Sequence, residues 1–135
     1  MNIGLDTSVV LRLLTDEPQA QARRALREVE ILLRQECSLF VADMVVAEVY
    51  FALQHHYGVP KAEALSMILD LFKKSGLKAS GAAASVLTIP NPAAANPGFV
   101  DRLIHAEYLE STQEMLTFEK AASRLSRVRV LHEPG

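Results

Sequence analysis

Residues 2–14 read NIGLDTSVVLRLL, and the organisation of the whole chain can be worked out from this stretch. A short, partly apolar run from Asn2 to Leu5 comes before three polar residues, Asp6, Thr7 and Ser8. We predict a buried strand that stops at Asp6, followed by a short helix that Thr7 or Ser8 caps and that runs to Leu14. A strand that leads directly into a helix is typical of α/β proteins.

The same alternation continues along the chain. Further helices are expected at 19–35, 44–57, 61–74, 99–109 and 120–125, and further strands at 39–42, 77–79, 114–118 and 128–131. Asp43 is expected to cap the helix that starts at Met44. Residues 80–98 are rich in Ala and Pro, which predicts a partial helix followed by an irregular loop. Strands that alternate with helices indicate an α/β fold whose sheet is mainly parallel and covered on both faces.

The composition fits one globular domain over residues 1–135, because half of the residues are hydrophobic and 22% are charged. The single cysteine, Cys37, excludes an intramolecular disulfide and a cysteine-based zinc site, and it favours a reducing, cytoplasmic setting. We expect no signal peptide, and the prolines in the longest uncharged run, residues 79–100, argue against a membrane span. The net charge of −2 identifies no partner, since a nuclease with an acidic centre and a basic rim can be acidic overall.

Asp6 is the first candidate for chemistry. Ligands of an open parallel sheet bind outside the carboxyl ends of the strands, and Asp6 stands where the first strand is expected to end. The alternative is that Asp6 helps to cap the following helix. Because Thr7 and Ser8 can already serve as caps, Asp6 is free to act as a ligand.

Glu48 is the second candidate, because its predicted helix carries apolar residues on every face. Such a helix should be mostly buried. A buried carboxylate must be paired, protonated or bound to a metal, since an unpaired buried charge costs many kcal/mol. Two interpretations of Glu48 are open: a structural salt bridge to an arginine, or a place in a functional site.

Asp101 and Glu119 complete an acidic set. Asp101 falls in the first turn of a helix, where the helix dipole alone would favour an acid. Glu119 follows a strand and is expected to share the crevice of Asp6, although it too lies near a helix start. Four carboxylates together suit Mg²⁺ or Mn²⁺, which prefer oxygen ligands. Such a metal site suits phosphodiester hydrolysis, because the metal polarises the phosphate and activates a water.

The order of these motifs resembles the PIN-domain family, and more narrowly the VapC toxins of prokaryotic toxin–antitoxin pairs. The resemblance covers nearly the whole chain and rests on four segments: Asp6-Thr7-Ser8, Val46-Ala47-Glu48-Val49, Phe99-Val100-Asp101-Arg102-Leu103-Ile104 and Thr117-Phe118-Glu119-Lys120. It implies a three-layer α/β/α fold with a central, mainly parallel sheet. It also implies a homodimeric, Mg²⁺- or Mn²⁺-dependent endoribonuclease that cleaves structured RNA, and a small antitoxin that blocks the site.

Carried over residue by residue, the resemblance assigns Asp6, Glu48 and Asp101 as acidic metal ligands, with Glu119 as the fourth acid. Thr7 and Thr117 would support them, and Thr117 matches the hydroxyl that often precedes the fourth acid. The chain departs from the family at Glu119, where Asp is usual. The longer side chain carries its carboxylate about 1 Å further, and Mg²⁺ demands tight octahedral geometry. The change to Glu leaves three possibilities open: a weaker enzyme, a changed metal preference, or a site that uses only three acids.

Basic residues next to these acids are candidates for RNA contacts. They are Arg102, Lys120 and Arg124. Two interpretations are open: a rim that holds RNA phosphates, or an ordinary solvated face. His105 follows Asp101 by four residues and could share a metal with it, although this spacing is common by chance.

Two other functions compete with a metal-dependent ribonuclease. A phosphatase with an aspartyl nucleophile would require a second acid two residues after Asp6, where this chain has Ser8. An inert binding module with the same fold is the remaining alternative, and Glu119 is its only support in the sequence.

Overall fold

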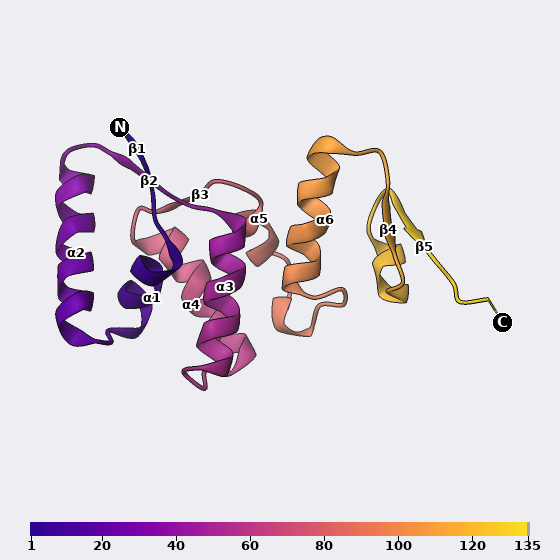
Figure 1. The fold of residues 1–135 in the computed structure, drawn as a ribbon, viewed down its shortest axis with the longest axis horizontal. Helices are drawn as coiled ribbons and strands as arrows, with labels where there is room; N and C mark the ends of the chain where they lie inside the picture. The colour runs from indigo at the N-terminus through magenta and orange to yellow at the C-terminus, as the bar shows by residue number, and fades with distance from the viewer. Residues whose placement is uncertain (135) are drawn as a thin grey trace.

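The computed structural model describes residues 1–134 and places them in an elongated α/β molecule (Figure 1). The elements follow in this order: β1 Asn2–Gly4, α1 Thr7–Thr15, α2 Gln19–Arg34, β2 Ser38–Val41, α3 Asp43–His55, α4 Lys61–Lys74, β3 Lys78–Ala79, α5 Ala83–Leu87, the 3₁₀ helix η1 Pro92–Ala94, α6 Phe99–Ser111, β4 Met115–Thr117, the 3₁₀ helix η2 Lys120–Arg124, and β5 Val128–Val130. The predicted alternation of strands and helices is confirmed, and most boundaries agree within two residues.

All strand pairs of residues 1–134 are parallel, as predicted, but they form two separate sheets. The larger sheet has the order β1-β2-β3, and the smaller one pairs β4 with β5. The sequence indicated one sheet. The difference arises because strand order depends on which distant segments meet, and local periodicity does not contain that information.

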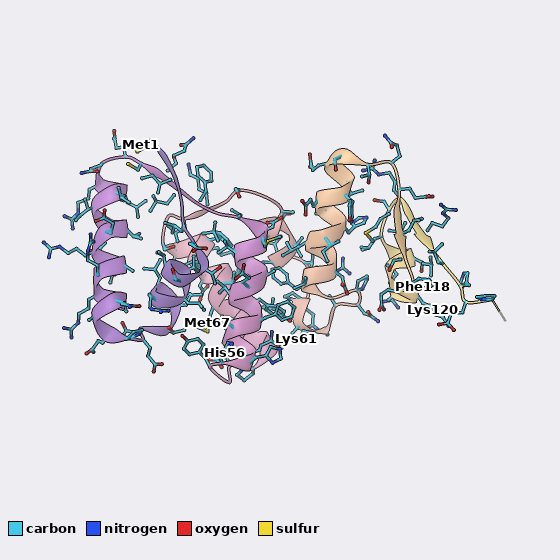
Figure 2. The ribbon with its side chains drawn as sticks, in the orientation of Figure 1. Met1, His56, Lys61, Met67, Phe118 and Lys120 are labelled. Atoms are coloured by element: carbon cyan, nitrogen blue, oxygen red, sulfur yellow. The ribbon has the colours of Figure 1, made fainter. Side chains whose placement is uncertain are left out.

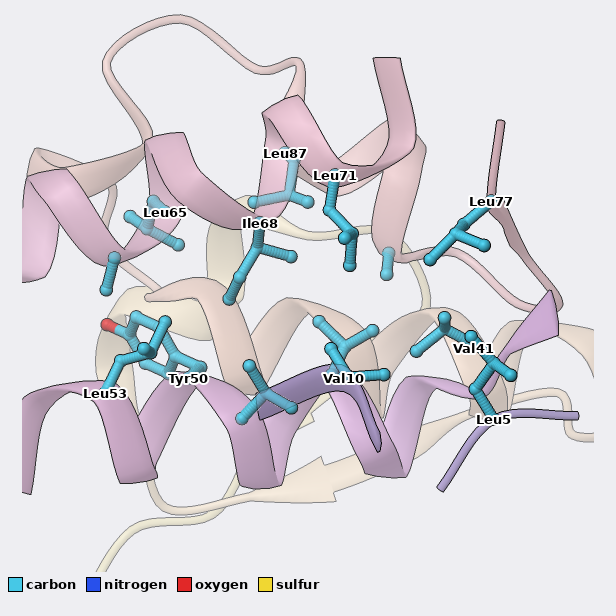
Figure 3. Close-up of a cluster of buried hydrophobic side chains, with 14 of the residues drawn as sticks. Leu5, Val10, Val41, Tyr50, Leu53, Leu65, Ile68, Leu71, Leu77 and Leu87 are labelled. Carbon is cyan, nitrogen blue, oxygen red and sulfur yellow. The ribbon is translucent and has the colours of Figure 1, made fainter. Parts of the chain in front are cut away.

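The main core lies around α3 and α4. Figure 3 shows Tyr50 and Leu53 of α3 facing Leu65 and Ile68 of α4, and all four side chains are buried. The apolar stripe of α4 follows the helical period, which is why its bounds were predicted without error. Burial of this apolar surface stabilises the larger part of the molecule, from β1 to α5.

The carboxyl-terminal part of the chain is attached to this core through α6. Phe99 and Leu103 of α6 are buried in the core cluster, and the Phe99 ring lies 5.2 Å from the Tyr50 ring, edge to face. In Figure 1, α6 stands between α3 and the β4–β5 sheet along the long axis of the molecule. No helix of residues 1–134 has both the length and the apolar character that a bilayer crossing requires.

Two local predictions were wrong. The strand β1 is not buried: Asn2 and Gly4 are exposed, because β1 is an edge strand of its sheet. Asp43 does not cap α3. Its carboxylate oxygens accept hydrogen bonds from the backbone N–H groups of Ala82 and Ala83, both at 3.0 Å, at the start of α5. Asp43 therefore joins α3 to a helix that lies 40 residues further along the chain.

This cap predicts a stability effect at two positions. Asp43→Ala leaves two N–H groups of α5 without their acceptor and should lower the free energy of unfolding by about 1–2 kcal/mol. Gly81→Ala should have an effect of similar size, because the added Cβ would lie 2.6 Å from Cγ of Asp43.

Gly4→Ala is the control for this pair of variants, since a Cβ there meets nothing within 4 Å. Urea unfolding of the three variants measures the effect. Equal stability of Gly81→Ala and Gly4→Ala would contradict the assigned contact.

Candidate active site

Asp6 follows β1 at the carboxyl end of the larger sheet and is exposed. It is the N-cap residue of α1, with extended backbone, and its carboxylate accepts a hydrogen bond of 2.8 Å from the Thr7 N–H. The prediction that Thr7 or Ser8 would cap this helix was therefore wrong. The Thr7 hydroxyl is buried, and it has no hydrogen-bond partner in the described part of the chain.

Glu48 lies in α3 and is exposed, so the expectation of a buried carboxylate was wrong. The helix buries Val46, Val49 and Leu53 on its core side and leaves a second apolar strip open. Met44 and Phe51, which lie on either side of Glu48 at helical spacing, are 75% and 45% exposed. An apolar helix is buried only where another element covers each face, and residues 1–134 of one chain leave this face uncovered.

Asp101 and Glu119 come together. With Thr117 they line one pocket of about 290 Å³ between α6, β4 and η2. Both carboxylates are exposed. The Glu119 N–H donates a hydrogen bond of 3.0 Å to the Thr117 hydroxyl, which shapes the turn after β4. The sequence predicted that Glu119 would follow a strand end and that Asp101 would lie in a first helical turn, and both placements are confirmed.

His105 holds the smaller sheet against α6. It is a buried residue, and its Nε2–H donates a hydrogen bond of 2.7 Å to the Ser126 carbonyl. The Arg127 guanidinium adds hydrogen bonds to the carbonyls of Leu109 and Thr112, of 2.8 and 3.2 Å. His105 thus has a structural partner in the fold, and nothing in its surroundings supports a role as a ligand beside Asp101.

Two of the three basic residues next to the acids donate hydrogen bonds to backbone carbonyls. Arg102 donates from Nε to the Pro97 carbonyl at 2.8 Å, and Arg124 donates to the Asn96 carbonyl at 3.0 Å. These bonds fix the segment that leads into α6. Lys120 is exposed and has no ion pair within residues 1–134. Of the three predicted RNA contacts, Lys120 is the one that the fold leaves available.

The four acids fall into two groups. Asp6 caps α1 and Glu48 lies in α3, two helices that contact each other, whereas Asp101 and Glu119 line the pocket between α6, β4 and η2. Figure 2 labels Met1, beside β1, and Phe118, beside Glu119, far apart along the long axis. Among residues 1–134 no three side chains of Asp, Glu, His or Cys lie close enough to hold a metal ion. A single chain in this arrangement does not provide the predicted four-carboxylate site.

Sequence reasoning overlooked one acidic cavity. A space of about 880 Å³ lies between the start of α3, α5 and α6, and its lining includes Asp43, Glu107 and Glu110. The Asp43 carboxylate already accepts hydrogen bonds from the N–H groups of Ala82 and Ala83. Glu107 and Glu110 are three residues apart on a helix, a signal that is too common to single out without the tertiary contact.

Comparisons with known proteins do not identify the chain. No protein-family model, no curated protein and no solved structure matches it. The resemblance therefore rests on the quoted motif residues alone.

Proposed function

We propose that this protein is a metal-dependent endoribonuclease of the PIN type, similar to the toxins of toxin–antitoxin pairs. The observation that carries the proposal is the meeting of Asp101, Thr117 and Glu119 in one pocket. Asp101 of α6 meets the Thr117–Glu119 turn after β4, and the two segments supply two of the four acids that the motif pattern selects.

The proposed fold is the three-layer α/β/α arrangement of that family. Parallel strands and helices in alternation support it, as does the place of Asp6 at the carboxyl end of β1. A single five-stranded sheet would additionally require an edge strand of the β1-β2-β3 sheet to pair in parallel with an edge strand of the β4-β5 sheet. This arrangement would bring the Thr117–Glu119 turn to the edge where Asp6 stands, because parallel strands end at the same edge.

The proposed cofactor is Mg²⁺ or Mn²⁺, since carboxylate oxygens are the ligands that these ions prefer. The acids of one chain, as placed, do not fit a metal ion, because only two of them share a pocket. For this reason no catalytic step is assigned through a metal. The proposed partners are a structured RNA substrate, a small cognate antitoxin and a second copy of the chain, in the cytoplasm.

An inert PIN-like binding module is the second candidate. Two observations favour it: Glu119 stands where the family usually has Asp, and the acids are divided between two parts of the molecule. Such a module would bind a partner and cleave nothing.

Cleavage of total RNA by purified protein separates the two candidates. The protein is incubated with Mg²⁺, with Mn²⁺ and with EDTA, and the fragments are resolved and their ends mapped. Discrete fragments that require metal would support the nuclease. Absence of cleavage by well-folded protein with either metal would reject the nuclease in favour of the module.

The departure at Glu119 gives a prediction of its own. Glu119→Asp restores the family residue and should leave RNA cleavage unchanged or raise it, because the turn held by the Thr117 hydroxyl needs only the backbone N–H. Initial cleavage rates with Mg²⁺ and Mn²⁺ measure the effect, and Glu119→Gln, which keeps the length without the charge, is the matched control. A large loss in Glu119→Asp would show that the longer side chain has a function that the family pattern does not supply.

A further inference from the structure

The pocket that Asp101 and Glu119 share also has an apolar end. Asp101 and Tyr108 both line it, and they stand two turns apart on α6, which is about 10 Å along the helix axis. β4 follows α6 after a short connection and runs back in the opposite direction (Figure 1). Thr117 and Glu119 therefore lie toward the Asp101 end of the pocket, and Met115 lies toward the Tyr108 end.

The walls of the apolar end suit a flat, uncharged group. Ile104 and Tyr108 are one turn apart on the same face of α6, and they are 44% and 47% exposed. Leu116 lines the pocket from β4 and is also exposed. Exposed apolar groups that gather around a cavity mark a binding site.

Tyr108 differs from the other exposed aromatic residues in its surroundings. The Phe51 ring is stacked on the His55 ring, with 6.2 Å between their centres. Phe118 is exposed but is not among the residues that line the pocket. The Tyr108 ring lines the pocket and has no aromatic partner within residues 1–134. A free aromatic face of this kind is the platform on which proteins stack unpaired nucleobases.

The acidic end of the pocket favours a base over an apolar protein segment. A segment that covered the whole pocket would also remove water from the exposed carboxylates of Asp101 and Glu119, which is costly without a partner for them. A single base covers only the Tyr108 end and leaves both carboxylates in contact with water. The volume of about 290 Å³ is at the lower limit of small-molecule sites, so it has room for a planar ring and not for a helix.

Lys120 provides a contact for the sugar–phosphate backbone at the rim of the pocket. It directly follows Glu119, is exposed and has no ion pair within residues 1–134. The neighbouring cations are engaged, since Arg127 donates to backbone carbonyls and Arg129 pairs with Glu114 at 3.0 Å. The carboxylates repel phosphate from the interior of the pocket, so the base enters and the phosphates stay at the rim, where the Lys120 ammonium can bind them.

We infer that this pocket holds one unpaired base of an RNA strand, stacked on the ring of Tyr108 beside the acidic end. The substrate is then a single strand or an unpaired loop, because a base inside a duplex has both of its faces covered by its neighbours. Tyr108 binds the base and takes no part in the chemistry, and it determines which phosphate lies next to Asp101. The effect on cleavage rests on the proposed function, whereas the binding of the base does not.

RNA binding without metal tests the base site independently of cleavage. A labelled RNA of about six unpaired nucleotides, and a ribose–phosphate chain of the same length without bases, are titrated with protein in EDTA and followed by fluorescence anisotropy. The wild type should bind the strand with bases about 10-fold more tightly. Tyr108→Ala and Tyr108→Leu should abolish this difference, and Tyr108→Phe should keep it because the ring remains. Tyr57→Ala, the same change at an exposed tyrosine after α3, is the matched control and should bind as the wild type does.

The outcomes separate the base site from the nuclease. Equal affinity of the wild type for both strands, or a difference that persists in folded Tyr108→Ala and Tyr108→Leu, would overturn the inference and leave the nuclease to the cleavage of total RNA. In an active enzyme, Tyr108→Ala should raise KM about 10-fold with little change in kcat, and an unchanged KM would contradict the role in cleavage. A wild type that cleaves nothing but prefers the strand with bases through Tyr108 would reject the proposed function and retain the base site.

Discussion

Asp6→Asn and Asp101→Asn are each expected to lower metal-dependent RNA cleavage by more than about 100-fold. Under the proposed function both residues are metal ligands; replacing groups that merely orient such ligands typically costs 10–100-fold, and the loss of a ligand should cost more. Asn retains the size of Asp and removes its charge. Initial rates on a mapped RNA substrate, with Mg²⁺ or Mn²⁺ in excess, measure the effect.

The choice of Asn separates chemistry from folding. The Asp6 carboxylate also caps α1, and Asn is as good an N-cap as Asp, so the Thr7 N–H keeps an acceptor. Asp101→Asn gives up only the charge near the helix start, worth about 0.3–1 kcal/mol. Both variants should therefore unfold close to the wild-type urea midpoint. Undiminished cleavage in both would remove these residues from the site.

Leu53→Ala is expected to have the largest effect on stability. Leu53 is fully buried between α3 and α4 (Figure 3). Truncating a buried Leu leaves a cavity and lowers the free energy of unfolding by about 2–5 kcal/mol. A domain of this kind is stabilised by only about 5–15 kcal/mol in total, so a large fraction of its stability would be lost.

Leu26→Ala makes the same chemical change on α2, where Leu26 is 52% exposed. It should alter stability by less than about 0.5 kcal/mol. Urea denaturation monitored by circular dichroism compares the two variants. Similar midpoints for both would mean that α3 and α4 do not pack as the structure places them.

The elements of this protein follow from local patterns. The apolar period of α4 and the Pro and Gly residues around it predicted its bounds, Lys61–Lys74, and the breaks at Pro18 and Gly98 predicted where α2 and α6 begin. Such signals act over one or two turns of chain. They were reliable because the helix period and the φ preferences of Pro and Gly do not depend on distant residues.

The side chains that link distant segments were predicted less well. The partner of the Asp43 carboxylate is at the start of α5, and a short-range rule assigned it to its own helix instead. Glu48 was expected to be buried because its helix is apolar on all faces, yet one face has no cover. In both cases the outcome depends on whether a segment far away in the sequence packs against the helix, which the local pattern does not contain.

The sequence by itself determined the order of helices and strands, the parallel direction of the strand pairs and the positions of Asp6, Asp101 and Glu119 at strand and helix ends. Local periodicity and capping chemistry govern these features. Only the tertiary structure decided that the strands form two sheets, that β1 is an open edge and that Asp6 lies apart from Glu119. These outcomes depend on which distant surfaces bury one another. The free energy of burying these surfaces is a sum over long-range contacts, and no short stretch of sequence contains it.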